Sequence, residues 1–95
     1  MLAVNRLHAY GDGEEQITGE LALLIDVFAT LPGFQRARAG RCLDEPDVWI
    51  LLTEWESVGT YRRALSSHVV KTNGQPVFVR VVDEPGAYDV FLAVG

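Results

Sequence analysis

The 95-residue sequence predicts an α+β domain in which one antiparallel sheet carries helices on a single face. Two patterns support this prediction. Apolar residues recur with a helical period between Glu14 and Thr30, and strand-forming residues run without a break from Val48 to Glu56. The remaining segments resemble short strands and turns. Because 95 residues correspond to one domain of ordinary size, we expect a single domain over residues 1–95.

The first half of the chain predicts a strand, a helix and a second strand. Residues 2–9 are expected to form the first strand, which Gly11-Asp12-Gly13 ends. The helix that follows, over residues 14–30, has an apolar stripe that consists of Ile17, Leu21, Leu24, Ile25 and Phe28. Leu31-Pro32-Gly33 is expected to end this helix, and residues 34–43 are predicted to form the second strand.

The second half predicts a hairpin, a short helix and a last strand. A turn over residues 44–47 joins the second strand to residues 48–56, and Ser57 is a good N-cap for a helix over residues 58–66. Residues 67–82 leave two interpretations open: a strand favoured by four valines, or a short helix that Pro76 begins. With a strand over residues 88–94, the order β-α-β-β-α-β is the ferredoxin-like arrangement.

The strand over residues 48–56 is apolar on both faces. Trp49 and Leu51 point one way, and Val48, Ile50 and Leu52 point the other. Helices on one side of a sheet cover only one of these faces, whereas a sheet with a wet face normally alternates apolar and polar residues. We therefore expect a homodimer in which two copies pack sheet against sheet.

Composition excludes several classes of function. The net charge of −5 argues against a nucleic-acid-binding surface. A single cysteine, Cys42, cannot form an internal disulfide, which fits a reducing compartment. The N-terminus does not resemble a signal peptide, and no apolar run is long enough to cross a bilayer. One cysteine and two histidines supply no zinc or iron spacing. We expect a cytoplasmic protein without a metal site or a membrane partner.

A candidate site combines an amide with aromatic rings. Asn5 interrupts an apolar strand and shares a face with Ala3, Leu7 and Ala9, so its amide either satisfies backbone groups or lines a pocket. Trp49 and Trp55 share a face of their strand, and Tyr61 follows on the next helix. These rings either pack in the core or enclose a small-molecule pocket with a few polar groups.

The order and spacing of several segments resemble the antibiotic biosynthesis monooxygenase superfamily of dimeric α+β barrels. The most specific segment is Thr53-Glu54-Trp55-Glu56-Ser57, which is followed by Tyr61. Leu31-Pro32-Gly33-Phe34 and the stretch over residues 83–88 also fit, so the resemblance covers nearly the whole chain. It implies cofactor-independent oxygenation of an aromatic, quinol-like molecule, with deprotonation of the substrate to an anion that reacts directly with dioxygen.

The same resemblance implies candidate site residues. Trp55 and Tyr61 stand at positions that the polyketide-oxidising members use, and with Asn5 they are the predicted catalytic residues. Trp49, Leu51 and Phe78 are the predicted substrate-binding residues. Polyketide-oxidising members carry an asparagine four residues before this tryptophan, and the chain has Leu51 there. That departure leaves open a non-catalytic, dimeric binding or accessory module as the alternative function.

A haem-degrading branch of the superfamily offers a third hypothesis. Residues 3–7, Ala-Val-Asn-Arg-Leu, resemble its first strand. That branch also needs a tryptophan on the second helix and an axial histidine downstream, and Ala64 and Gly74 occupy those positions here. Haem degradation is therefore disfavoured, and we expect no cofactor.

Overall fold

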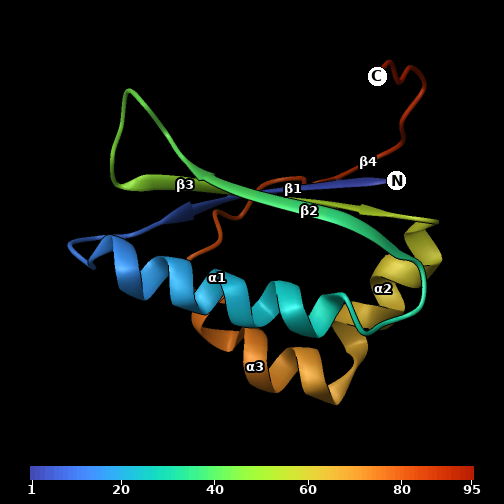
Figure 1. The fold of residues 1–95 in the computed structure, drawn as a ribbon, viewed down its shortest axis with the longest axis horizontal. Coiled ribbons are helices and arrows are strands. Elements are labelled where there is room, and N and C mark those ends of the chain that lie inside the picture. Colours follow the sequence, from blue (N-terminus) through green and yellow to red (C-terminus); the bar gives the residue numbers. More distant parts are fainter.

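The computed structural model describes residues 1–95 and consists of one four-stranded antiparallel sheet with three helices on one face (Figure 1). Its elements are β1 (Leu2–His8), α1 (Glu14–Phe28), β2 (Phe34–Arg41), β3 (Val48–Trp55), α2 (Val58–Ser66), α3 (His68–Phe78) and β4 (Ala87–Tyr88). The strand order is β2-β3-β1-β4. The predicted α+β, ferredoxin-like class is confirmed. None of the three helices has both the length and the apolar character that crossing a membrane requires.

The central strand β3 alternates strictly between buried and half-buried residues. Its buried residues face the helices and consist of Trp49, Leu51, Thr53 and Trp55. The helix α1 supplies the other half of this core through the predicted stripe, of which Ile17, Leu21, Leu24 and Phe28 are buried. On the opposite side, Val48, Ile50 and Leu52 are only half-buried. The sheet therefore has one face in the core and one open apolar face. Figure 1 shows that no helix lies on the open side.

The helix α2 begins as the sequence predicts. The Ser57 hydroxyl accepts a hydrogen bond from the Thr60 N–H at 3.1 Å, and the Thr60 hydroxyl accepts one from the Ser57 N–H at 3.3 Å. This reciprocal pair satisfies two backbone donors that a helix N-terminus otherwise leaves free. The capping pair therefore sets the first residue of the helix that carries Tyr61.

Of the two structures that the sequence left open for residues 67–82, the helix is the one that forms, but it is longer than expected and Pro76 does not begin it. The helix α3 begins at His68, where the Ser67 hydroxyl accepts from the Val70 N–H, and Pro76 lies inside it instead of beginning it. Val70 and Val77 are buried among the core residues, and packing against α1 outweighs the strand propensity of valine. Only Val81 pairs as a strand residue, in an isolated bridge to Leu7.

The predicted last strand over residues 88–94 is wrong in extent. The strand β4 contains only Ala87 and Tyr88, which pair with Ala3 and Leu2 of β1. Because β1 begins at Leu2, residues beyond Tyr88 have no neighbouring strand in the same chain. Residues 89–95 therefore have no regular structure and are exposed.

A cluster of charged groups joins the end of α3 to α1. The Arg80 guanidinium contacts Glu20 of α1 at 2.8 Å and Asp12, before α1, at 2.7 Å. Its side chain is only 13% exposed. Hydrogen bonding to Arg80 lowers the pKa of Glu20 below its ordinary value. Removal of Arg80 would leave the Glu20 and Asp12 carboxylates without a compensating charge.

This cluster predicts an acid-dependent loss of stability. In the unfolded chain Glu20 binds a proton at a higher pH than in the folded chain, so the free energy of unfolding should fall as the pH drops from about 5 to 3. Urea denaturation across this range should show a smaller fall for Glu20→Gln than for the unchanged chain. Glu14→Gln, at an exposed and unpaired glutamate, is the matched control. Equal pH dependence in all three proteins would contradict the prediction.

Candidate functional site

The inner face of β1 is open to solvent at one residue. Ala3 and Leu7 on this face are 0% and 1% exposed, whereas Asn5 between them is only half-buried. The Asn5 amide therefore lies in the layer between the sheet and the helices and is still partly accessible to solvent. The predicted polar residue of the site therefore lies where a ligand has access.

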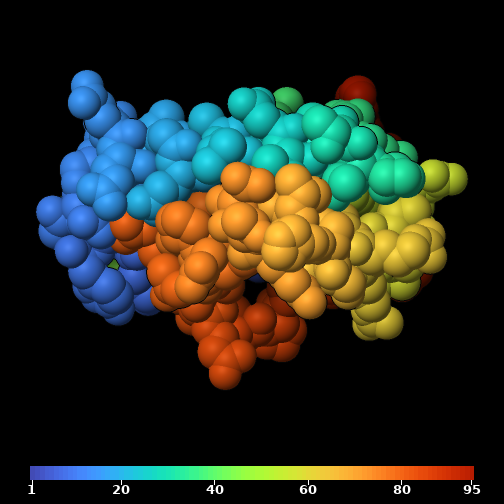
Figure 2. All heavy atoms as spheres, turned by 90° about the horizontal axis from the view of Figure 1, so that it is seen from below, coloured from blue at the N-terminus to red at the C-terminus, as the bar shows by residue number.

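The segment that follows α3 makes this opening. The Val82 N–H donates to the Arg6 carbonyl at 2.8 Å, and the Val4 N–H donates to the Gly86 carbonyl at 2.7 Å. Between these two hydrogen bonds, residues 83–85 turn away from the edge of β1. A Cβ atom at Gly86 would lie 2.8 Å from the Val4 carbonyl oxygen and 3.3 Å from Asn5 Oδ1, so the close approach requires glycine. Figure 2 shows a notch on the helical face beside this red-orange segment.

Tyr61, in the second turn of α2, is the polar neighbour of Asn5. Burial raises the pKa of the Tyr61 hydroxyl above its usual value of 10.0, and the neighbouring Asn5 amide partly opposes this rise. The phenol is therefore neutral at physiological pH and can donate a hydrogen bond, but it is a poor base. The amide and the phenol form a pair of neutral donors at the opening.

Trp55 lies behind Tyr61 and is fully buried. Its ring centroid is 5.7 Å from that of Tyr61, and Phe28 and Phe34 contact it edge-on at 5.2 and 5.4 Å. The indole N–H donates to the Thr53 hydroxyl at 2.9 Å, so its only polar group is satisfied inside the protein. Trp55 therefore supports Tyr61 from the core and has no free group with which to bind a ligand.

The structure distributes the other predicted site residues along the core. Leu51 is buried and is the direct cross-strand partner of Asn5. Phe78 is half-buried at the end of α3. Trp49 pairs with Leu7 nearer the opposite end of β3, and the Arg41 guanidinium lies 5.6 Å from its ring centroid. Asn5, Leu51, Tyr61 and Trp55 are thus linked by direct neighbour relations, and Trp49 lies apart from Trp55.

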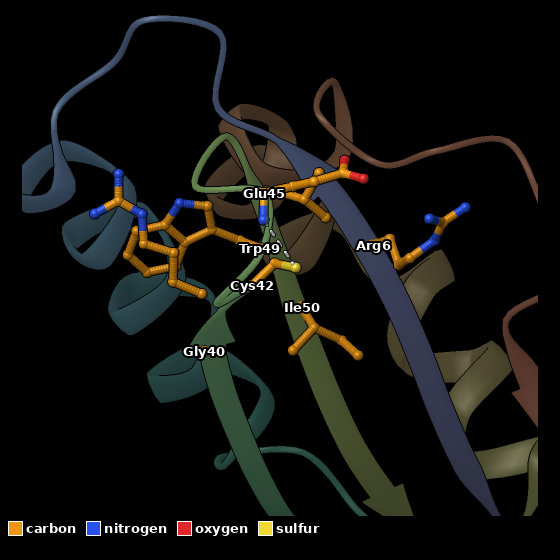
Figure 3. Close-up of a pocket in the computed structure, with 8 residues that line it drawn as sticks. Arg6, Gly40, Cys42, Glu45, Trp49 and Ile50 are labelled. Atoms are coloured by element: carbon orange, nitrogen blue, oxygen red, sulfur yellow. Dashed lines mark hydrogen bonds between the residues drawn. The ribbon is translucent and has the colours of Figure 1, made fainter.

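None of the five hollows in the protein surface is lined by Asn5, Trp55 or Tyr61. One hollow, of about 340 Å³, lies on the open side of the sheet. Figure 3 shows residues that line it: Cys42 and Ile50 lie on one side of β1, and the Arg6 side chain points away on the other side. The Arg6 guanidinium pairs with Glu84 at 2.7 Å. No preformed chamber therefore lies beside Asn5.

Sequence reasoning singled out Asn5 and Tyr61, whose part in a site stays a prediction, and did not single out Gly86. The turn signal at Pro85-Gly86 was visible in the sequence, but its approach to β1 depends on the path of the chain after α3. At the two positions where the haem-degrading branch carries a tryptophan on the second helix and an axial histidine, this chain has no room for a larger side chain. Ala64 is buried, and a Cβ atom at Gly74 would lie 2.6 Å from the Phe78 ring. No cluster of three or more metal-ligating side chains occurs.

Comparison with known proteins gives one family and many similar structures. The family model described as antibiotic biosynthesis monooxygenase matches residues 1–73. A variant of SnoaB, a cofactor-independent oxygenase from Streptomyces nogalater, shares 22% identity over 98% of this chain and 94% of its own, with a TM-score of 0.86. Another SnoaB structure shares 21% identity over 99% and 92%, with a TM-score of 0.76. PA3566 from Pseudomonas aeruginosa shares 10% over 94% and 92%, with a TM-score of 0.69. No curated protein matches the sequence.

Proposed function

Because the chain belongs to the antibiotic biosynthesis monooxygenase family, we propose that it is a cofactor-independent oxygenase of an aromatic, quinol-like small molecule. The similarity in fold to SnoaB, which is a cofactor-independent oxygenase, supports the reaction class. We further propose that residues 1–95 act as one domain. The single thiol of Cys42 has no disulfide partner and favours a reducing compartment such as the cytoplasm.

The observation that carries this proposal is the position of Asn5. The family resemblance places a functional asparagine at the position of Leu51, and Asn5 is the direct cross-strand partner of Leu51. Residues directly opposite each other in an antiparallel pair have Cβ atoms about 5 Å apart on the same face of the sheet. The amide that this chain lacks on β3 is therefore supplied from β1, at the same level of the sheet and next to the Tyr61 hydroxyl.

The proposed reaction converts a ring CH₂ group beside a phenolic system into a carbonyl. One molecule of dioxygen supplies the carbonyl oxygen, its second oxygen leaves as water with the two hydrogens, and the substrate supplies all the electrons. In the first step a proton passes from the substrate to water, because Tyr61 is a poor base, and negative charge develops on the substrate oxygen. This proton is taken up again when the second oxygen of dioxygen leaves as water. Donors aimed at that oxygen stabilise the anion most where water is excluded.

Each candidate residue has a role in this proposal. Asn5 and the neutral Tyr61 phenol donate hydrogen bonds to the anionic oxygen, and Trp55 holds the Tyr61 ring from behind. Leu51 forms an apolar wall beside the amide. Phe78 and Trp49 contribute apolar surface elsewhere in the same core layer. No metal or organic cofactor takes part, because the substrate anion reduces dioxygen itself.

Dioxygen uptake tests the proposal. The protein is incubated with a panel of anthrone-like and quinol substrates, and oxygen consumption is recorded with an electrode alongside product formation. We expect consumption of one dioxygen per carbonyl formed, at a rate above the uncatalysed background and proportional to protein concentration. No uptake with any member of the panel would contradict an oxygenase.

A non-catalytic binding module is the second candidate, and the dense packing around Trp55 favours it. Because no preformed chamber lies beside Asn5, this alternative predicts ligand binding without turnover. Anaerobic titration of the same panel against intrinsic tryptophan fluorescence separates the two functions. Saturable quenching without subsequent oxygen uptake on admission of air supports the module, whereas quenching followed by uptake supports the oxygenase.

We also propose that two copies form a homodimer through their open sheet faces. Val48, Ile50 and Leu52 on this face are half-buried and no element of the same chain covers them. A second sheet packed about 10 Å away would remove this apolar surface from water. The small core of one copy would then gain a second layer.

Replacement of an apolar side chain at the centre of this face predicts dissociation. Ile50→Glu places a charge where the partner sheet packs, so light scattering should change from a dimer, at twice 10.5 kDa, toward a monomer. Leu23→Glu, on the exposed side of α1, is the matched control and should remain dimeric. A monomer for the unchanged chain at micromolar concentration would contradict the proposed dimer.

A further inference from the structure

Residues 83–85, which we call the bulge, interrupt the segment that runs beside β1. The backbone hydrogen bonds of Val82 and Gly86 to β1 flank the bulge, so that its three residues lie opposite the single residue Asn5. Unequal numbers of residues in two paired strands form a β-bulge, a feature that is common next to active sites. A Cβ atom at Gly86 would lie 3.3 Å from Asn5 Oδ1, so the bulge begins close to the amide of the candidate site.

The bulge brings negative charge near this amide. Two of its three residues, Asp83 and Glu84, are acidic. Because consecutive Cα atoms are 3.8 Å apart, the Cα atom of Glu84 lies within about 8 Å of that of Gly86. A carboxylate at such a distance opposes the development of a second negative charge, and more strongly where water is partly excluded. An oxyanion bound at Asn5 therefore requires that the charge of the bulge be compensated.

Arg6 supplies this compensation for Glu84. The Arg6 Nε donates to Glu84 Oε1 at 2.7 Å, and this hydrogen bond raises the pKa of Arg6 above its ordinary value. Successive residues of a strand point to opposite faces, so Arg6 lies on the open face whereas Asn5 lies on the inner face. Figure 3 shows the Arg6 side chain pointing away beyond β1. The ion pair therefore holds the Glu84 carboxylate on the side of the sheet opposite to the amide.

We propose that Arg6 is a positioning residue of the candidate site, because it holds and neutralises Glu84 and thereby allows the Asn5 amide to stabilise a substrate oxyanion. Arg6 acts through Glu84 and does not touch the substrate. Glu45, in the β2–β3 turn, also acts on the charge of Arg6, but only Glu84 forms an ion pair with it. The proposal rests on the proposed oxygenase site at Asn5 and adds the electrostatic control of that site.

Anaerobic binding of 4-nitrophenol tests this role without turnover. Ionisation of this phenol changes its absorbance, so a pH titration gives the pKa of the bound molecule. We expect Arg6→Met to raise that pKa by about 0.5–1 pH unit, which is a roughly 3–10-fold weaker preference for the phenolate. Arg6→Lys keeps the charge and should recover most of this loss. Arg38→Met, which removes an arginine without an ion pair from the same face, is the matched control and should have no effect.

The variant Glu84→Gln distinguishes charge compensation from a purely structural role of the ion pair. The Arg6 and Glu84 side chains are 54% and 35% exposed, so both substitutions leave the core intact. If the pair only fixed the shape of the bulge, Glu84→Gln would raise the pKa of the bound phenol as Arg6→Met does. We expect no rise in Glu84→Gln, and we expect the double variant Arg6→Met with Glu84→Gln to return to the value of the unchanged protein. A rise in Glu84→Gln, or no recovery in the double variant, overturns the proposal.

The variant Asn5→Leu separates this proposal from that of the site itself. Asn5→Leu removes the donor and should raise the pKa of the bound phenol more than Arg6→Met does. If the unchanged protein shows no saturable binding, or if Asn5→Leu has no effect, the proposed site is wrong and the role of Arg6 is wrong with it. If Asn5→Leu raises the pKa and Arg6→Met does not, the site stands and only the role of Arg6 is wrong.

Discussion

Replacing Asn5 with leucine is expected to lower the rate of dioxygen uptake at saturating substrate about 100-fold, the usual loss when one donor to a developing oxyanion is removed. The fold should tolerate the change, because Asn5 is half-buried and its neighbours on the inner face of β1 are already apolar. The loss therefore measures anion stabilisation and not stability. Circular dichroism of the variant should match that of the unchanged protein.

A second asparagine provides the control for this prediction. Asn73 of α3 is also half-buried, but its amide donates to the Val69 carbonyl at 2.8 Å within the helix and lies outside the proposed site. Asn73→Leu should retain the uptake rate within about twofold, since an isolated side-chain hydrogen bond adds little to stability and nothing to the anion. An equal loss in both variants would show that the effect of Asn5→Leu is not specific to the site.

Trp55→Ala is expected to lower the free energy of unfolding by about 3–5 kcal/mol, the range for removing a large aromatic side chain from a core. The ring is fully buried and contacts Phe28, Phe34 and Tyr61, so its loss leaves a cavity under the site. The Thr53 hydroxyl would also lose its indole donor. Urea denaturation followed by circular dichroism, at one fixed protein concentration, measures the change.

The variant Trp55→Phe tests whether Trp55 only supports the Tyr61 ring or contacts the ligand itself. Phenylalanine keeps an aromatic ring behind Tyr61, so we expect a smaller loss of stability and nearly unchanged substrate affinity. Leu43→Ala, at an exposed turn residue, should leave both quantities unchanged. A large loss of affinity in Trp55→Phe with normal stability would place the indole in direct contact with the ligand and contradict its supporting role.

Local patterns were sufficient to predict the first five elements of the fold approximately. The stripe on α1, the run of apolar residues in β3 and Ser57 before α2 each determine structure within a few neighbouring residues. The region after α2 was not predictable in this way. Its valines favour a strand, but Val70 and Val77 are buried among core residues in a helix that packs against α1. The packing of α3 against α1, which is distant in sequence, therefore determines that this segment is helical.

The C-terminal strand shows a different limit. Residues 88–94 have the composition of a strand, yet a strand requires a neighbour, and β1 offers backbone partners only to Ala87 and Tyr88. The structure gives residues 89–95 no strand partner within the chain. The sequence pattern indicates an apolar segment there but does not indicate where its contacts lie.

The residues of the candidate site stay a prediction from the sequence, and the sequence did not predict how they lie relative to one another. An amide in an apolar strand singles out Asn5, and the aromatic residues after β3 single out Trp55 and Tyr61. The register that places Asn5 opposite Leu51, and the path of residues 83–86 that exposes Asn5, follow only from the folded structure. Trp55 is likewise a core residue because three rings and Thr53 surround it.

The most direct test of the central claim, that Asn5 supplies from β1 the amide that position 51 lacks, is dioxygen uptake by the double variant Asn5→Leu with Leu51→Asn. Because the two residues are cross-strand partners, exchanging them returns the amide to the same level of the inner face. We predict that Asn5→Leu alone is nearly inactive and that the double variant regains uptake to within about 10-fold of the unchanged protein, as expected for a donor restored near its original place. Full activity in Asn5→Leu alone, or no recovery in a correctly folded double variant, would contradict the account.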